Sequence, residues 1–160
     1  MVDFLVIGYI NSISYNNIHP LVINGKFSFG YNKVISYKGE ISAQGEWFSN
    51  ISDYCPPPFE FKKQHKEEDF RKFDNLHIIN IDRIEDIPSD YQDIMGVPLS
   101  FLDKWNRDQF EIVGLLSDNK GDGIYIFNGS ETYTDERHKK SKCGVIDGKR
   151  IYCRLLIKKK

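Results

Sequence analysis

Cysteine is scarce in this chain and long hydrophobic runs are missing, and each absence excludes a class of protein. The cysteines Cys55, Cys143 and Cys153 form no C-x-x-C pair, so neither a disulfide framework nor a cysteine zinc site is predicted. The histidines are scattered without zinc-finger spacing, and we expect no metal. No apolar run approaches the roughly 20 residues that cross a bilayer, and the first residues do not resemble a signal peptide. We therefore expect a cytoplasmic protein that makes no membrane contact.

Acidic residues are scarce at one end of the chain only. Residues 137–160 contain ten Lys or Arg and a single acid, Asp147, whereas the first 136 residues contain twelve basic and twenty-two acidic side chains. The formal net charge of −1 therefore hides an acidic body near −10 and a basic tail near +9. Such asymmetry predicts a tail that binds a polyanion. The alternative is a solvated tail that balances charge and aids solubility.

The first thirty residues predict part of an α/β unit. Residues 4–7, FLVI, form an apolar run that predicts a strand buried on both faces, as in a parallel sheet. Residues 15–23 predict a short helix, which Pro20 limits to its first turn or kinks. Ligands of open α/β sheets bind beyond the carboxyl ends of strands, which makes Asn11 a candidate pocket residue. The alternative for Asn11 is an amide that satisfies backbone groups of its own loop.

The middle of the chain predicts further strands separated by polar segments. Residues 31–46 alternate in polarity and predict a strand pair or an irregular loop. Residues 61–73 alternate in charge sign and predict an exposed helix or a mobile loop. Residues 76–81 and 110–113 predict two more buried strands. Together these segments favour an α/β fold with a mixed sheet.

Residues 95–115, MGVPLSFLDKWNRDQFEIVGL, carry the most specific pattern in the chain. Gly96 close to Pro98 predicts a tight bend, and Asn106 supplies oxygens for a turn. The segment closely resembles the C-terminal signature of the EcoRI-type adenine-specific DNA methyltransferases, M-G-V-P-[IL]-[ST]-F-L-D-K-[YW]-N-P-x-Q-F-E-I-[IVL]-G. It departs from that signature at Arg107, where the family usually has proline.

Two other segments carry the same resemblance. Residues 4–22, FLVIGYINSISYNNIHPLV, resemble the family segment that follows the catalytic motif, although Tyr9 replaces an asparagine. Residues 47–51, WFSNI, resemble the family's W-F-T-N-L element. We predict from it that Trp47 stacks on a splayed base and that Asn50 contacts an adenine edge. The alternative is that Trp47 is a core residue and Asn50 a cap.

The segment CPPPF, residues 55–59, lacks the side chain that would make it catalytic. Adenine-N6 methyltransferases use [DN]-P-P-[FYW], in which the Asn or Asp accepts a hydrogen bond from the adenine amino group and the ring stacks on the flipped base. Pro56 stands at the acceptor position here. We interpret the segment as a rigid loop, and we expect no catalytic residue in this chain.

The end of the chain combines a hairpin signal with basic residues. Asp147-Gly148 predicts the turn of a hairpin. The stretch VIDGKRIYCRLLI, residues 145–157, resembles the C-terminal ending of the family, so we expect the C-terminus to be complete. From the resemblance and the charge we predict DNA contacts by five basic residues: Lys149, Arg150, Arg154, Lys158 and Lys159.

The resemblance implies a fold that is only part of such an enzyme, because it covers most of this chain but only the C-terminal half of the family. We expect the C-terminal strands of a partial Rossmann-like methyltransferase sheet, with a β-rich, basic C-terminal recognition region. The expected division is the end of the methyltransferase core in residues 1–30, a recognition region in 31–136 and a basic tail hairpin in 137–160.

The resemblance also implies a function, which is transfer of a methyl group from S-adenosylmethionine to adenine N6 in duplex DNA, within a restriction–modification system. The cofactor site and the N-P-P-F motif are expected outside this chain, in upstream sequence or on a separate N-terminal methyltransferase polypeptide. The chain alone is then expected to be inactive. The alternative is a catalytically inactive DNA-binding or protein-interaction module descended from such an enzyme.

Overall fold

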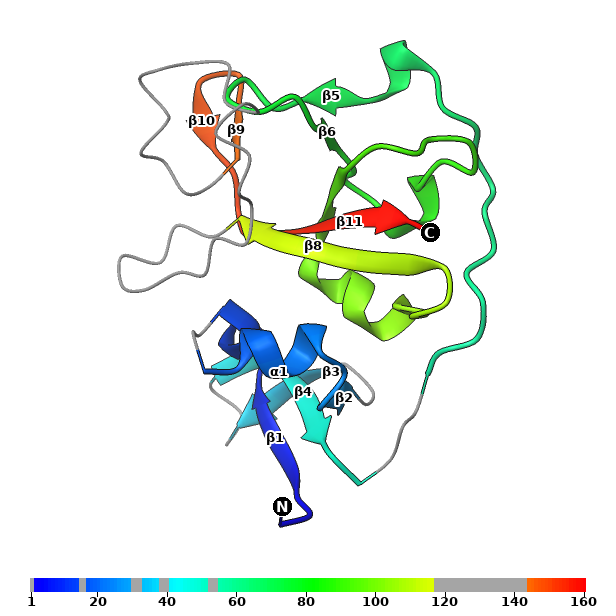
Figure 1. Ribbon diagram of the computed structural model, residues 1–160. Helices are drawn as coiled ribbons and strands as arrows, with labels where there is room; N and C mark the ends of the chain where they lie inside the picture. The colour runs from blue at the N-terminus through cyan, green and yellow to red at the C-terminus, as the bar shows by residue number, and fades with distance from the viewer. Residues whose placement is uncertain (1, 15–16, 30–32, 38–40, 52–54, 117–143) are drawn as a thin grey trace.

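The computed structural model describes residues 2–14, 17–29, 33–37, 41–51, 55–116 and 144–160. They form two β-sheets, one from the first fifty residues and one from the later residues, together with a short hairpin (Figure 1). The helices are short, and the fold is mixed α/β and rich in strands. The α/β class expected from the sequence is confirmed at this level.

The N-terminal sheet is antiparallel and has a nine-residue strand in its middle. Its strands are β1 (Leu5–Tyr9), β2 (Ser28–Phe29), β3 (Lys33–Tyr37) and β4 (Ile41–Ser49). β4 pairs with β1 along one edge and with β2 and β3 along the other. Of the two structures that residues 31–46 allow from the sequence, the strand pair is therefore correct.

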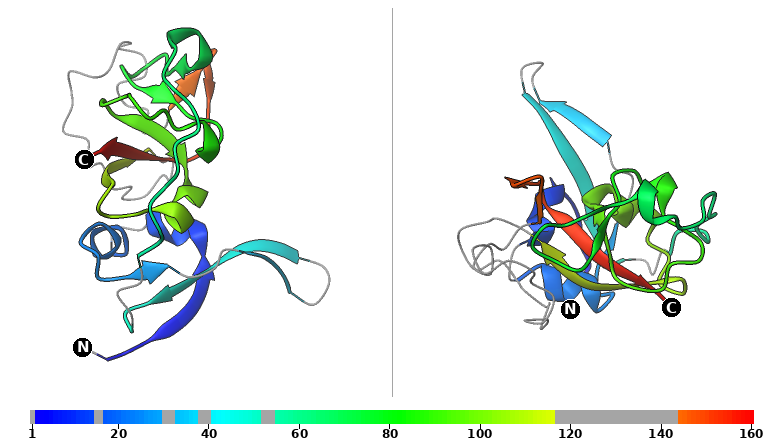
Figure 2. Two further views of the ribbon diagram at one scale, coloured as in Figure 1. Left: turned by 90° about the vertical axis from the view of Figure 1, so that its right-hand side faces the viewer. Right: turned by 90° about the horizontal axis from the view of Figure 1, so that it is seen from above.

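β1 is an edge strand, and the expectation of a parallel strand buried on both faces is wrong. It runs antiparallel to β4, and the exposed fractions are 56% for Leu5, 48% for Val6 and 46% for Ile7. Its second edge has no partner strand among the described residues, and Figure 2 shows β1 at the border of the molecule beside the N-terminus. An apolar run indicates a strand, but burial also requires neighbouring elements.

Two short helical segments link β1 to β2. The 3₁₀ helix η1 (Ile10–Ser14) follows β1, and the α-helix α1 (His19–Ile23) has Pro20 in its first turn. Proline is tolerated there because the first amides of a helix have no intrahelical acceptor. The helix ends where Asn24 Nδ2 donates to Pro20 O at 2.7 Å and Gly25 adopts a φ of 65°. A short helix with Pro20 in its first turn is confirmed, but it spans residues 19–23 of the expected 15–23.

The C-terminal sheet is mixed, with its five strands in the order β5–β6–β7–β11–β8. They are β5 (Arg71–Lys72), β6 (Ile79–Asn80), β7 (Met95–Pro98), β8 (Phe110–Leu116) and β11 (Arg154–Lys159). β6 and β7 run parallel, and the other described neighbours run antiparallel. Short 3₁₀ helices lie in the connections: η2 (Glu67–Asp69), η3 (Ile84–Asp86) and η4 (Leu99–Lys104). The strand expected at 110–113 is confirmed, whereas that at 76–81 is reduced to two paired residues.

The last strand lies in the interior of this sheet. Leu155, Leu156 and Ile157 of β11 are completely buried, with β7 on one side and β8 on the other. The alternative of a solvated tail is therefore wrong for this part of the chain. The basic residues of the tail lie beside or within a buried strand, and only some of their side chains point to solvent.

The predicted hairpin precedes β11. β9 (Val145–Ile146) and β10 (Lys149–Arg150) pair antiparallel across the turn. Asp147 has a φ of 52° and Gly148 a φ of 71°. Two successive positive φ angles are typical of the tight two-residue turn that Asp-Gly favours. The hairpin expectation is confirmed.

Gly96 does not form the predicted bend. It lies inside β7, and ring carbons of Phe73 come within 2.8 Å of the point where a Cβ would be. The missing side chain therefore allows the Phe73 ring to pack directly on the strand. In the sequence, a glycine close to Pro98 is equally compatible with a turn and with such a close approach.

The exposed helix allowed at residues 61–73 is also wrong. The segment contains no α-helix, and its regular elements are η2 and β5. His65 stacks on Phe70 with ring centroids 5.4 Å apart, and it lies 4.7 Å from the Tyr91 ring. Its ring contacts thus lie partly within the segment and partly with the later residue Tyr91.

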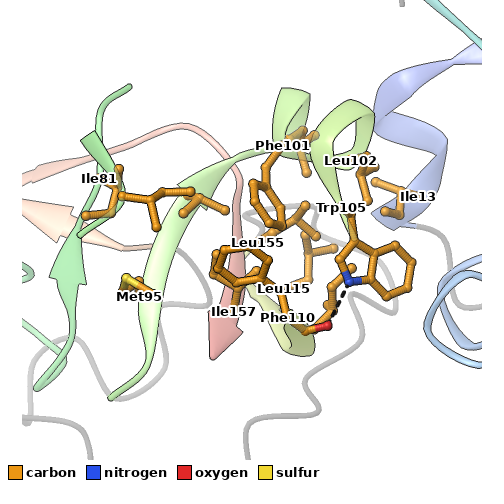
Figure 3. Packing of buried hydrophobic residues seen from close by; sticks show 14 of the residues in the cluster. Ile13, Ile81, Met95, Phe101, Leu102, Trp105, Phe110, Leu115, Leu155 and Ile157 are labelled. Atoms are coloured by element: carbon orange, nitrogen blue, oxygen red, sulfur yellow. Dashed lines mark hydrogen bonds between the residues drawn. The ribbon is translucent and has the colours of Figure 1, made fainter. Parts of the chain in front are cut away.

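One hydrophobic core joins the two sheets. Figure 3 shows Ile13 of η1 beside Leu102 and Trp105, at the end of η4. Phe101 and Phe110 meet edge to face with centroids 5.1 Å apart, and Trp105 Nε1 donates to Phe110 O at 3.1 Å. The segment around η4 thus links the N-terminal elements to β8 and β11.

Candidate functional site

Asn50, predicted to contact an adenine edge, is bound to the start of β1. Its Oδ1 accepts from Phe4 N at 2.8 Å, and its Nδ2 donates to Val2 O at 3.0 Å. Ser49 Oγ adds a third bond, to Phe4 O at 3.0 Å. This arrangement matches the capping alternative for Asn50, because both ends of its amide hold the chain that leads into β1.

Trp47 is half-buried in β4 and lies directly opposite Ile7 of β1. Residues opposite each other in an antiparallel pair share a face of the sheet, so Trp47 and Ile7 lie on the same face. That face also carries Leu5 and Tyr9 by the alternation of β1. Trp47 is therefore part of an exposed apolar face, and base stacking by it stays a prediction.

Asn11, the candidate pocket residue, lies in η1 just beyond the end of β1. The sequence places it correctly after a strand. Its side chain is outside the part of the structure that is described. A pocket role for Asn11 therefore stays a prediction.

Three of the five basic residues predicted to contact DNA present exposed side chains. Lys149 and Arg150 form β10 of the hairpin, and Lys158 lies near the end of β11. All three come from the last sixteen residues, although they lie on two different strands. These side chains lie at the surface of the C-terminal sheet and of its hairpin.

The other two basic residues are occupied within the fold. Arg154 donates from Nε to Asn80 Oδ1 at 3.1 Å and lies 3.6 Å from Asp82 Oδ1. Burial lowers the pKa of Arg154 from its ordinary value, and the Asp82 charge opposes that change. Lys159 Nζ donates to Ser89 O and lies 4.7 Å from the centre of the Phe61 ring. These contacts brace β11 against the segments before β7.

The proline-rich segment is a structural loop, as interpreted from the sequence. Pro56 O accepts a hydrogen bond from Asn106 Nδ2 at 2.7 Å. Phe59 packs edge to face against Phe61 and Phe110, with centroid distances of 5.3 and 6.0 Å. The segment is thus fastened to the start of β8, and its aromatic ring belongs to the core around that strand.

A buried carboxyl group that the sequence analysis missed lies where the two sheets meet. Glu46 of β4 is completely buried, and its carboxyl oxygens have no hydrogen-bond partner among the described residues. Burial, followed by the negative charge of Asp103 on η4, raises the pKa of Glu46 to about 8. Glu46 is two residues from the buried Phe48, and strand alternation could have indicated that both point inward.

A cleft of about 370 Å³ lies between the turn after α1 and the C-terminal sheet. Trp105, Arg107 and Lys160 contribute to its lining. The Arg107 guanidinium lies 5.5 Å from the Trp105 ring centre, and its Nη2 donates to Phe27 O at 3.3 Å. Arg107 therefore connects the two halves of the chain.

Two kinds of feature are absent from the described residues. No group of three or more His, Cys, Asp or Glu side chains in that part of the chain is arranged to hold a metal ion. Among the same residues, no helix has the length and apolar character needed to cross a membrane.

Comparison with known proteins identifies relatives along the whole chain. The model of the EcoRI adenine-specific methyltransferase family matches residues 38–160. The Type II methyltransferase M.MgeORF184P of Mycoplasma genitalium is 29% identical over 184 residues, covering 98% of this chain and 57% of the relative. M.EcoRI of Escherichia coli is 28% identical over 136 residues, covering 69% and 42%, and M.MpnI of Mycoplasma pneumoniae is 24% identical over 185 residues, covering 99% and 57%. No solved structure matches this chain.

The chain spans little more than half the length of the two mycoplasma relatives and less than half of M.EcoRI. The family match begins just after β3, covers β4 and the C-terminal sheet, and includes the signature at residues 95–115. The resemblance inferred from the sequence is confirmed. The chain belongs to the EcoRI family of adenine-specific methyltransferases.

Proposed function

We propose that this chain is the C-terminal part of an adenine-N6 DNA methyltransferase of a restriction–modification system. The observation that carries the proposal is the family match over residues 38–160, combined with coverage of only 57% of M.MgeORF184P. The remaining part of the enzyme would carry the S-adenosylmethionine site and the N-P-P-F motif. This chain would supply DNA contacts and part of the fold.

The chemistry requires an acceptor side chain that the CPPPF segment does not offer. The target adenine must leave the base stack, and its amino group must donate to a side-chain and a backbone oxygen before it attacks the methyl group. In CPPPF, Pro56 stands at the acceptor position and has no acceptor side chain. We therefore propose that the catalytic pocket is completed by the other part of the enzyme, with Asn11 as the candidate residue of this chain nearest to it.

The two sheets suggest which part of the chain belongs to the methyltransferase core and which part recognises DNA. β3 and β4 share one sheet with β1, so we propose that the end of the methyltransferase core extends to about residue 50 rather than to residue 30. This sheet would be the C-terminal edge of the Rossmann-like sheet. The five-stranded sheet with its hairpin would be the DNA-recognition region.

Phosphate contacts are proposed for the exposed basic residues Lys149, Arg150 and Lys158. Lysine and arginine neutralise DNA phosphates, and the release of counterions makes such binding strongly dependent on salt. Arg154 and Lys159 are engaged within the fold, and we propose for them a role in holding β11. Base contacts by Trp47 and Asn50 stay predictions.

The test is methyl transfer from labelled S-adenosylmethionine to duplex DNA. The chain is assayed alone and together with the polypeptide encoded immediately upstream, and in parallel with the part of M.MgeORF184P that lies outside the match. Activity only with a complementary polypeptide supports the proposal. Activity of the chain alone contradicts it. Salt-sensitive DNA binding without activity in any mixture would favour the alternative, an inactive DNA-binding module.

A further inference from the structure

We infer that the outer edge of β1 is the docking site for a strand of the polypeptide that completes the methyltransferase. The inference rests on the proposed function, since it names the surface through which the two parts of the enzyme join. It assigns a role to the most exposed apolar segment of the described structure.

The first support is the unprotected character of this edge. Leu5, Val6, Ile7 and Tyr9 are between 46% and 56% exposed. β1 contains no charged residue and no proline, and its pairing with β4 has no bulge. Edge strands of proteins are normally protected by one of these devices, because unpaired backbone groups attract other strands. An apolar edge without them is expected to be covered.

The second support is that both faces of β1 carry exposed apolar side chains. Val6 lies opposite Phe48, on the face that points to the core, and Ile7 lies opposite Trp47 on the other face. A cover over one face would therefore leave the other in water. A partner that adds a strand to the edge and packs over both faces, as neighbours do in an α/β sheet, would cover all of them.

The third support is that β1 is already fixed in an extended conformation. It pairs with β4 along its whole length, from Leu5 opposite Ser49 to Tyr9 opposite Gly45. The hydrogen bonds of Asn50 to Phe4 and Val2 fix the residues before it. A docking strand thus meets a preformed edge and does not have to order it, which favours binding by strand addition.

A second copy of the chain is a less suitable occupant. Two β1 edges would pair over five residues, a length of about 17 Å, and a stable protein interface buries about 800 Å² on each partner. The edge alone is small against that area. By contrast, about two-fifths of the length of M.MgeORF184P has no counterpart in this chain. A folded polypeptide of that size can cover the edge and both faces.

The test is binding of the complementary polypeptide to the chain and to two variants, measured by sedimentation and by isothermal titration. The probes are the same two polypeptides that enter the methyl-transfer assay. Val6→Lys places a charge on the docking edge, and Tyr152→Lys places the same charge on an exposed aromatic position of the other sheet. Both variants are expected to melt like the parent chain when isolated, since both side chains are about half exposed or more.

We expect Val6→Lys to weaken the complex about 30-fold or more and Tyr152→Lys to change it less than about twofold. Ile7→Lys is the second variant, to be used if Val6→Lys alters the melting of the isolated chain. The inference would be overturned if no complex forms, or if Val6→Lys and Tyr152→Lys weaken the complex equally. It would also be overturned if the chain forms a dimer with itself that Val6→Lys dissociates. Complex formation without methyl transfer would leave the docking site intact and contradict the proposed function. Methyl transfer that is the same for Val6→Lys and the parent chain would support the proposed function and contradict the docking site.

Discussion

β1 and β11 contain similar apolar runs but have opposite environments. Leu5, Val6 and Ile7 of β1 are about half exposed, whereas the corresponding run of β11, Leu155 to Ile157, is completely buried. β11 has a strand on each side, and β1 has one strand on one side among the described elements. The comparison teaches that an apolar run determines the formation of a strand, while the neighbours of that strand determine its burial.

The two sheets also differ in the surroundings of their ionisable side chains. The basic side chains around β11 are divided between solvent and specific partners, as Lys158 and Lys159 illustrate. In the N-terminal sheet, the Glu46 carboxyl is buried without a hydrogen-bond partner among the described residues. The N-terminal sheet thus contains a buried carboxyl group whose pKa is raised to about 8, whereas the basic side chains around β11 reach solvent or a specific partner.

The largest effect is expected from truncation of the buried strand. Leu155→Ala should lower the free energy of unfolding by about 3 kcal/mol, because it leaves a cavity in a packed core. Val6→Ala in β1 should change it by less than about 1 kcal/mol, since that side chain is already half exposed. Urea denaturation followed by circular dichroism measures both. Equal losses for the two variants would contradict the contrast between the strands.

A smaller effect is expected where the second sheet depends on a glycine. Gly96→Ala should cost about 2 kcal/mol, because its Cβ would overlap the ring of Phe73. Phe73→Leu should cost less in the Gly96→Ala background than in the parent chain. A double-mutant cycle of unfolding free energies measures this coupling. Simple additivity of the two changes would show that the ring and the glycine do not meet.

The buried carboxyl predicts a dependence of stability on pH. The folded protein holds the pKa of Glu46 at about 8, above its ordinary value of 4.5, so the native state binds more protons than the unfolded state between these values. Stability from this group should therefore fall as pH rises from about 4.5 through 8. Glu46→Gln should be more stable than the parent at pH 9, by about 2 kcal/mol, with the difference shrinking toward pH 5.

Thermal unfolding of both proteins across this pH range provides the measurement. Glu111→Gln, an exposed acid on β8, is the matched control and should show no such trend. A constant difference between Glu46→Gln and its parent from pH 5 to pH 9 would mean that Glu46 ionises normally in the folded chain.

The smallest effect on stability is expected at the exposed basic residues. Lys158→Ala should leave the unfolding free energy within about 0.5 kcal/mol of the parent, and it should reduce the salt dependence of DNA binding by about one ion. Lys159→Ala should mainly lower stability, because its ammonium group is bound to Ser89 O. Fluorescence anisotropy with duplex DNA at several salt concentrations separates the two. Identical behaviour of the adjacent lysines would contradict their different assignments.

Local chemistry made part of this fold predictable. Asp147 and Gly148 define their own turn, Pro20 limits its own helix, and the signature at residues 95–115 identifies the family. Each of these features depends on residues close together in the sequence. The position of β11 between β7 and β8 depends instead on pairing between segments about forty to sixty residues apart, which no local pattern records.

The sequence predicts which residues belong to the candidate site, but it does not predict what those residues contact. Asn50 and Trp47 were selected by family resemblance, but the pairing of β4 with β1 decides what they contact. Arg154 was selected by its charge, and its engagement with Asn80 and Asp82 follows from the order of the strands. Glu46 was missed because its burial results from the packing of one sheet against the other.

Hydrogen exchange of the backbone amides of β1 and β11 tests the central contrast most directly. It is measured on the isolated chain and on the chain with its complementary polypeptide. In both states the amides of β11 should be strongly protected. The β1 amides that face away from β4 should exchange rapidly in the isolated chain and become protected in the complex. Slow exchange along both edges of β1 in the isolated chain, or no change in β1 on complex formation, would contradict the account.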